Sequence, residues 1–169
     1  MGFLKKIMEF FAELFAKKGK ITTTMPQTDT KTAPVAPKQP TIRLITLSEY
    51  LMDRDTEYKL APEFKNNALV LLEKVNKLIQ KSGIERSVNS GWRPTYYNNL
   101  AGGSRKSAHL SCEAIDLKDS DDKMKTWIME NQEVLEEFDL YLEDPRYTDT
   151  WVHLQTRAVG SGRRVFIPY

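Results

Sequence analysis

Cysteine and histidine are both scarce in this sequence. Its 169 residues contain one cysteine, Cys112, and two histidines, His109 and His153. A single cysteine excludes an internal disulfide, so the fold has to be held by a core or by a metal. The sequence also lacks a large excess of charge of one sign, because 25 basic and 23 acidic residues leave a formal net charge of +2. Without a strong positive field, nucleic acid is not expected as a partner.

Residues 3–18 have the pattern of an amphipathic helix, with lysines and glutamates opposite an apolar face. The segment does not fit a transmembrane span or a recognisable signal peptide, because Glu9 and Glu13 interrupt it. Two binding surfaces remain for residues 1–20: a membrane surface or a partner protein such as a virion protein. The apolar face consists of Phe3, Leu4, Ile7, Met8, Phe10, Phe11, Leu14 and Phe15.

Residues 21–41 are rich in threonine and proline, with seven Thr and four of the eight Pro of the chain. Such a composition buries too little apolar surface to order itself, and it predicts an extended linker. The chain therefore divides into a helix over 1–20, a linker over 21–41 and one compact domain over 42–169.

The compact domain is predicted to be of the α+β class, with a small, mainly antiparallel sheet and helices packed on one face. Pro62 suits the first turn of a long helix and Gly83 suits its end. The predicted helices span 47–53, 62–81 and 121–135; the predicted strands span 87–90, 114–117, 140–143 and 151–155; residues 98–104 are predicted to form a loop. The predicted inward residues of the two longer helices are Leu69, Leu72, Val75, Leu78 and Ile79, then Met124, Trp127, Ile128, Met129 and Leu135.

Strand alternation places several chemically active side chains on the face opposite the helices. Asp116, Glu143 and His153 each point away from the apolar residues of their own strands, so they converge if the three strands are neighbours. His109 precedes Asp116 by seven residues and can enter the same site from a loop. Two histidines and a carboxylate form a sufficient ligand set for a catalytic zinc, with the fourth position left to water.

Several separated motifs, in this order, closely resemble the M15 family of zinc peptidases, in particular the branch of D-Ala-D-Ala carboxypeptidases and phage endolysins. The resemblance covers residues from about 42 to the end, and it implies a hedgehog/D-Ala-D-Ala peptidase-like fold with Zn²⁺ held by His109, Asp116 and His153. The motifs are Ser90-Gly91-Trp92-Arg93-Pro94, Asn98 or Asn99, Gly102-Gly103-Ser104, Ser107-x-His109, Glu113-Ala114-x-Asp116 and Trp151-Val152-His153.

The general base departs from the pattern of this family. Many members carry an acid three residues before the last histidine, a position that Thr150 occupies here. Glu143 is the leading substitute because it shares the face of the ligands, while Asp149 and Asp144 remain alternatives. Arg93 is the candidate for steadying the oxyanion or for clamping a substrate carboxylate.

The resemblance implies hydrolysis of an amide bond in the peptide stem of bacterial peptidoglycan by a phage or prophage lytic enzyme. Such an enzyme acts in the virion or in the host cell envelope or periplasm. Thr150 motivates an alternative, a catalytically inactive virion-associated or wall-binding module that retains the fold. An iron(II) oxygenase with a two-histidine, one-carboxylate site ranks third, because its acid usually lies closer to the first histidine.

Vesicle flotation decides between the two surfaces open to the N-terminal helix. Residues 1–20 fused to a soluble reporter are expected to float with anionic vesicles if the apolar face binds membranes. A fusion that stays with the unbound protein ends the membrane alternative and leaves the protein partner.

Overall fold

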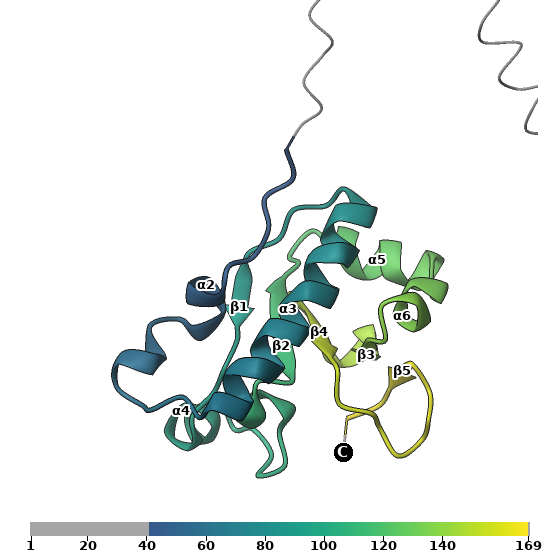
Figure 1. The fold of residues 1–169 in the computed structure, drawn as a ribbon. Coiled ribbons are helices and arrows are strands. Elements are labelled where there is room, and N and C mark those ends of the chain that lie inside the picture. The colour runs from purple at the N-terminus through teal and green to yellow at the C-terminus, as the bar shows by residue number, and fades with distance from the viewer. Residues whose placement is uncertain (1–40, 169) are drawn as a thin grey trace, which may run out of the picture. The chain divides into compact units, whose positions relative to one another are not determined.

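A five-stranded sheet forms the centre of the structure, a computed structural model that describes residues 41–168 (Figure 1). In spatial order the strands are β1 (Val88–Ser90), β2 (Ala114–Lys118), β4 (Trp151–Gln155), β3 (Tyr141–Glu143) and β5 (Val165–Phe166). Neighbouring strands pair antiparallel except β3 and β5, which pair parallel. The predicted α+β class and mainly antiparallel sheet are therefore confirmed.

Helices pack against this sheet, and α3 (Pro62–Ser82) is the longest of those described. The other α-helices are α2 (Leu47–Leu51), α4 (Thr95–Leu100), α5 (Lys123–Glu130) and α6 (Glu133–Glu137). Within the described residues there are also three short 3₁₀ helices: η1 (Arg54–Thr56), η2 (Ala108–Ser111) and η3 (Pro145–Tyr147).

Helix α3 begins and ends where its sequence predicts. Pro62 occupies the first turn, and Gly83 ends the helix in the left-handed conformation with φ of 69°. Leu69 was a wrong prediction for the core, since 49% of its surface is exposed. It lies roughly 100° around the helix from Ala68, which belongs to the buried face. That face consists of Ala68, Leu71, Leu72, Val75, Leu78 and Ile79.

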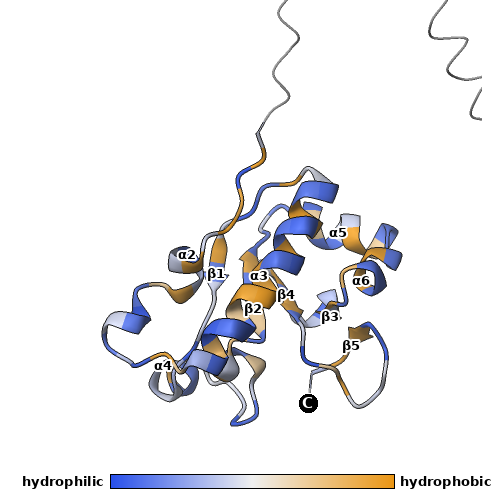
Figure 2. Ribbon diagram, in the orientation of Figure 1, coloured by the Kyte–Doolittle hydropathy of each residue, from blue (hydrophilic) through white to orange (hydrophobic). Residues whose placement is uncertain are grey.

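The two faces of the sheet differ in chemistry. Ile115 and Leu117 of β2, with Val152 and Leu154 of β4, belong to the same buried apolar cluster as the inner face of α3. Successive strand residues point to opposite faces, so Asp116 and the residues that alternate with Val152 and Leu154 lie on the other side. The helices therefore cover one face and leave the polar site on the other, as predicted. Figure 2 shows hydrophobic, orange stretches of the chain where α3 passes the sheet.

Residues 121–135 form two helices rather than the single predicted one. The chain leaves helical geometry at Asn131, with φ of −130° and ψ of 51°, and Asn131 Nδ2 donates to Trp127 O in the last turn of α5. An asparagine that bonds the backbone in this way competes with helix continuation. Met129, predicted to be inward, is 38% exposed, because it lies roughly 100° around α5 from the buried Ile128.

The segment predicted as a loop, residues 98–104, begins inside helix α4. Pro94 directly precedes this helix, which runs on to Leu100. Asn98 then donates from Nδ2 to the carbonyls of Gly103 and Ser104 and ties the following turn to the helix. The asparagine is thus a bridging residue rather than a turn former.

Strand β5 was not predicted, since two residues carry no readable alternation.

The predicted N-terminal helix over 1–20 and the linker, apart from Thr41, lie outside the described residues. Among helices within 41–168, none combines the length and the apolar character that crossing a bilayer requires.

Gly91 provides a test of how closely α2 packs against the end of β1. A Cβ at this position would lie 1.8 Å from the backbone oxygen of buried Tyr50. Backbone cannot yield as a flexible side chain can, so Gly91→Ala is expected to lower the free energy of unfolding by at least roughly 1–3 kcal/mol. Urea denaturation measures this, with Gly160→Ala as the control because nothing lies within 4 Å of its Cβ position. Equal stabilities of the two variants would contradict the close approach.

Candidate metal centre

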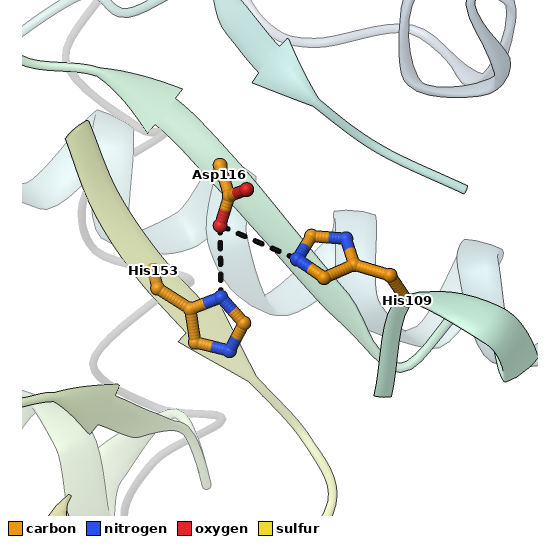
Figure 3. A group of neighbouring side chains, drawn as sticks. All are labelled: His109, Asp116 and His153. Atoms are coloured by element: carbon orange, nitrogen blue, oxygen red, sulfur yellow. Dashed lines mark hydrogen bonds and ion pairs between the residues drawn. The ribbon is translucent and has the colours of Figure 1, made fainter. Parts of the chain in front are cut away.

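Two neighbouring strands and one short helix bring His109, Asp116 and His153 together (Figure 3). In the antiparallel pairing of β2 with β4, Asp116 lies directly opposite His153. His109 comes from η2, whose first turn is capped by Ser107: its Oγ accepts from the backbone N–H of His109. Strands β2, β4 and β3 are neighbours, which was the condition for the convergence of Asp116, His153 and Glu143, and η2 before β2 supplies His109.

The three side chains are buried and share one focus. Asp116 Oδ1 lies 2.8 Å from His153 Nδ1 and 3.3 Å from His109 Nε2. Their candidate ligand atoms all lie within 4.8 Å of one another. Exposure is 2% for His109, 4% for Asp116 and 9% for His153. One small cation can therefore reach all three.

His109 shows that this donor set fits a metal. Its Nδ1 lies 2.8 Å from the carbonyl oxygen of Gly91, which can only accept, so Nδ1 carries the proton and Nε2 presents a lone pair. Nε2 is buried and has no hydrogen-bond partner among the described residues. Asp116 Oδ1, 3.3 Å away, cannot fill that role, because a carboxylate oxygen and an unprotonated ring nitrogen both only accept. Leaving a buried acceptor unsatisfied is costly. A cation bound between the three residues would satisfy Nε2 of His109. Neutral imidazole and carboxylate are both suitable ligands for zinc.

The charges of the site are consistent with this reading. Burial lowers the pKa of His109 and favours the neutral ring that binds metals. Burial acts against the charge of Asp116, but the two histidines hold its pKa well below the usual range. Burial is likewise outweighed at His153, whose pKa is raised by Asp116 and Glu143. The site thus contains an ionised carboxylate that is stabilised by a neighbouring positive charge. Either a proton on His153 or a metal cation supplies that charge.

Arg93 lies against the same carboxylate from the side of β1. Its terminal nitrogen forms an ion pair with Asp116 Oδ2, and its Nε donates to Ser90 Oγ at 2.7 Å. Because Asp116 Oδ1 faces the histidines, the two oxygens of this carboxylate have different partners. Arg93 therefore orients Asp116, and these contacts use two of its five N–H groups.

Glu143 ends β3 beside His153. Its Oε2 lies 4.0 Å from His153 Nδ1, and it lines the same cleft as His109, Asp116 and Arg93. Burial raises the pKa of Glu143, with opposing contributions from His153 and Arg93 and a further increase from Asp116. A carboxyl group of raised pKa is a better proton acceptor than an exposed glutamate. The remaining lining residues are Asn89, Ala101, Ser107 and Trp151.

The two alternative acids lie elsewhere. Asp144 accepts hydrogen bonds from Arg146, with its Oδ2 2.6 Å from the guanidinium, and caps η3. Asp149 is exposed, and its backbone carbonyl accepts from Lys125. Neither of them lines the cleft, and Thr150 does not line it either. Cys112 is fully buried in the apolar cluster, apart from the ligand group.

Three contributors to the site were not assigned from the sequence. Ser90 accepts from Arg93, and Asn89 lines the cleft. Ser90 begins one of the family motifs but had no role assigned, and nothing in the pattern of β1 marks Asn89. Gln155 lies with its Oε1 3.2 Å from His153 Nε2. Its signal was readable, since alternation places Gln155 on the same face of β4 as His153.

Comparison with known families gives one match. The profile of the peptidase M15 family matches residues 46–155, well over half of the 169 residues. The matched segment contains all three clustered residues, Arg93 and Glu143. No curated protein sequence matches the chain.

The metal site is tested by titrating the full-length protein with Zn²⁺ in competition with a chromophoric chelator. Asp116→Ala is expected to weaken zinc binding by more than about 100-fold, beyond the loss typical of an outer hydrogen-bond partner of a ligand. Cys112→Ala is the control and is expected to retain wild-type affinity, because Cys112 lies outside the cluster. Loss of zinc from the cysteine variant with retention by the aspartate variant would reassign the site.

Proposed function

The chain belongs to the peptidase M15 family, and we propose that it is a zinc-dependent peptidase that hydrolyses an amide bond in the peptide stem of bacterial peptidoglycan. The observation that carries the proposal is the convergence of His109, Asp116, His153 and Glu143 on one cleft. Two histidines and a carboxylate leave a coordination position for water, which is the arrangement of catalytic rather than structural zinc sites.

The residues of the cleft divide the chemistry of amide hydrolysis among them. When bound, zinc supplies Lewis-acid chemistry, acidifying water and polarising the scissile carbonyl. Glu143 takes the proton of the attacking water on a carboxylate oxygen and delivers it to the leaving amine. Its half-buried position and raised pKa suit both transfers, since the group holds a proton more readily than an exposed glutamate.

Arg93 has two parts in the proposal. Through its ion pair with Asp116 Oδ2 it keeps the other carboxylate oxygen directed at the histidines. Its remaining N–H groups supply positive charge for the oxyanion that develops on the scissile carbonyl, or for a carboxylate of the substrate.

Thr150 supports a competing proposal, a non-catalytic wall-binding module that has lost its base. The position of Glu143 argues against it, because a carboxylate lies 4.0 Å from His153 without an acid at residue 150. We therefore favour an active enzyme.

Peptidoglycan as the substrate suits a phage or prophage lytic enzyme that acts in the virion or the host cell envelope. Within that proposal, the amphipathic segment over 1–20 attaches the peptidase to a membrane surface or to a virion protein, and residues 21–41 give it reach. The flotation experiment described above tests the attachment separately from catalysis.

Purified sacculi provide the test of the reaction. The zinc-loaded full-length protein is expected to release peptide fragments that mass spectrometry identifies, and a chelator is expected to stop the release. Glu143→Gln should keep zinc but lose roughly 100-fold or more of the activity, because the amide cannot accept the proton. Asp149→Asn is the matched control and should remain active, since Asp149 does not line the cleft.

Each opposite result has a defined meaning. Stem peptides left intact by the zinc-loaded wild type would support the non-catalytic module. An active, zinc-loaded Glu143→Gln variant would remove Glu143 from the role of base. Loss of activity in Asp149→Asn alone would assign that role to the aspartate.

A further inference from the structure

His153 offers only one of its two ring nitrogens to the metal centre. Nδ1 lies 2.8 Å from Asp116 Oδ1, whereas Nε2 lies 3.2 Å from Gln155 Oε1. Gln155 is the last residue of β4 and is 7% exposed, with its backbone paired to Ala114 on one side and Tyr141 on the other. Its backbone is thus held inside the sheet, and its side-chain amide lies next to the ring of His153.

A chain of obligatory donors and acceptors orients this amide. Gln155 Nε2 donates to the carbonyl oxygen of Arg157 at 2.6 Å, and a carbonyl can only accept. The NH₂ end therefore faces Arg157, and the oxygen end faces His153. Since an amide oxygen also only accepts, His153 Nε2 must carry the proton. In a neutral imidazole this leaves the lone pair on Nδ1, the atom directed at Asp116.

The backbone that begins this chain is itself fixed. The guanidinium of Arg157 donates to Glu113 Oε2 at 2.9 Å through Nε and to the carbonyl of Lys106 at 2.7 Å, and it also contacts Ser111 Oγ. Ser111 belongs to η2, the short helix that carries His109. The same arginine therefore links the segment after β4 with the element that supplies the other histidine ligand.

Each of the two histidines is thus oriented by a backbone carbonyl, one directly and the other through a glutamine side chain. His109 is held directly by the carbonyl of Gly91, which leaves Nε2 for the metal. His153 is held by the carbonyl of Arg157 through Gln155, which leaves Nδ1. A buried amide with both ends engaged cannot turn over without leaving polar atoms unsatisfied.

We propose that Gln155 is a positioning residue that fixes the tautomer of His153, so that Nδ1 is the atom presented to the metal. The inference rests on the zinc centre of the proposed function but not on the substrate. Removing the acceptor allows the ring to protonate at Nδ1 or to turn, and the loss of such an outer partner typically costs about 10- to 100-fold in metal affinity.

The test measures zinc affinity and the protonation of each ring nitrogen in the full-length protein. Gln155→Met keeps an unbranched side chain of similar length and removes the amide. It is expected to weaken zinc binding by about 10- to 100-fold in chelator competition. Gln155→Glu keeps an acceptor for Nε2–H and is expected to lose less affinity than the methionine variant. Gln132→Met is the matched control, because the side chain of this exposed glutamine donates its hydrogen bond to Met129 O, away from the metal centre, and the variant should bind zinc as the wild type does.

Nitrogen-15 NMR reads the tautomer directly, because the chain contains only two histidines and therefore four ring nitrogens. In the zinc-loaded wild type and in Gln155→Glu, His153 is expected to carry its proton on Nε2 and His109 on Nδ1. In Gln155→Met the His153 pattern should change while that of His109 persists. A merely structural role for Gln155 would leave the ring-nitrogen pattern of the folded protein unchanged.

Two results overturn the proposal. One is a zinc-loaded wild type with the His153 proton on Nδ1, which requires no variant to fold. The other is a Gln155→Met variant that keeps both wild-type affinity and the Nε2 proton. A wild type that binds no zinc would overturn the metal centre together with this inference. Zinc binding with the expected tautomers but no attack on sacculi would overturn only the proposed peptidoglycan reaction.

Discussion

The antiparallel pairing of β2 with β4 is the constraint on which the site depends. It places Asp116 opposite His153 in the centre of the sheet, where both backbones are held by ladder hydrogen bonds. A shift by one residue would turn Asp116 into the apolar layer and bring Ile115 to the polar face. Because Ile115, Leu117, Val152 and Leu154 are fully buried under the helices, such a shift is strongly disfavoured. The hydrophobic core therefore sets the register that aligns the polar residues.

Around this pairing, backbone carbonyls decide which ring nitrogens face the carboxylate. The carbonyl of Gly91 sets His109, and Gly91 is itself placed by the close approach of α2 at Tyr50. On the opposite side, Arg157 and Gln155 act on His153. Carbonyl oxygens only accept, so each contact has one possible polarity. The positions of backbone carbonyls therefore determine which ring nitrogen of each histidine faces Asp116. The side chain of Gln155 is needed only to relay this orientation to His153.

The three clustered residues could be singled out from the sequence for particular reasons. His109 and His153 are the only histidines, and period-two alternation in short apolar runs gave the faces of Asp116 and His153. Glu143 followed from the same alternation, and its placement beside His153 needed only that β3 and β4 be neighbours. Two errors involve asparagine side chains that bond the backbone. Asn131 interrupts the helix expected over 121–135, and Asn98, inside α4, ties the turn after this helix to it in a segment expected to be a loop. Asparagine bonds the backbone in several ways, and its composition alone does not select among them.

By itself the sequence determined the fold class, the face of each strand and the identity of the residues that carry metal-binding chemistry, since these depend on periodicity and on side-chain type. Only the tertiary structure decided which acid lies beside the histidines, because Glu143, Asp144 and Asp149 have the same carboxyl chemistry and differ only in position. It also decided the partners of Arg93 and the role of Gln155, which depend on contacts between segments far apart in the chain. Distances of a few ångströms across a sheet arise from packing, and no local pattern encodes them.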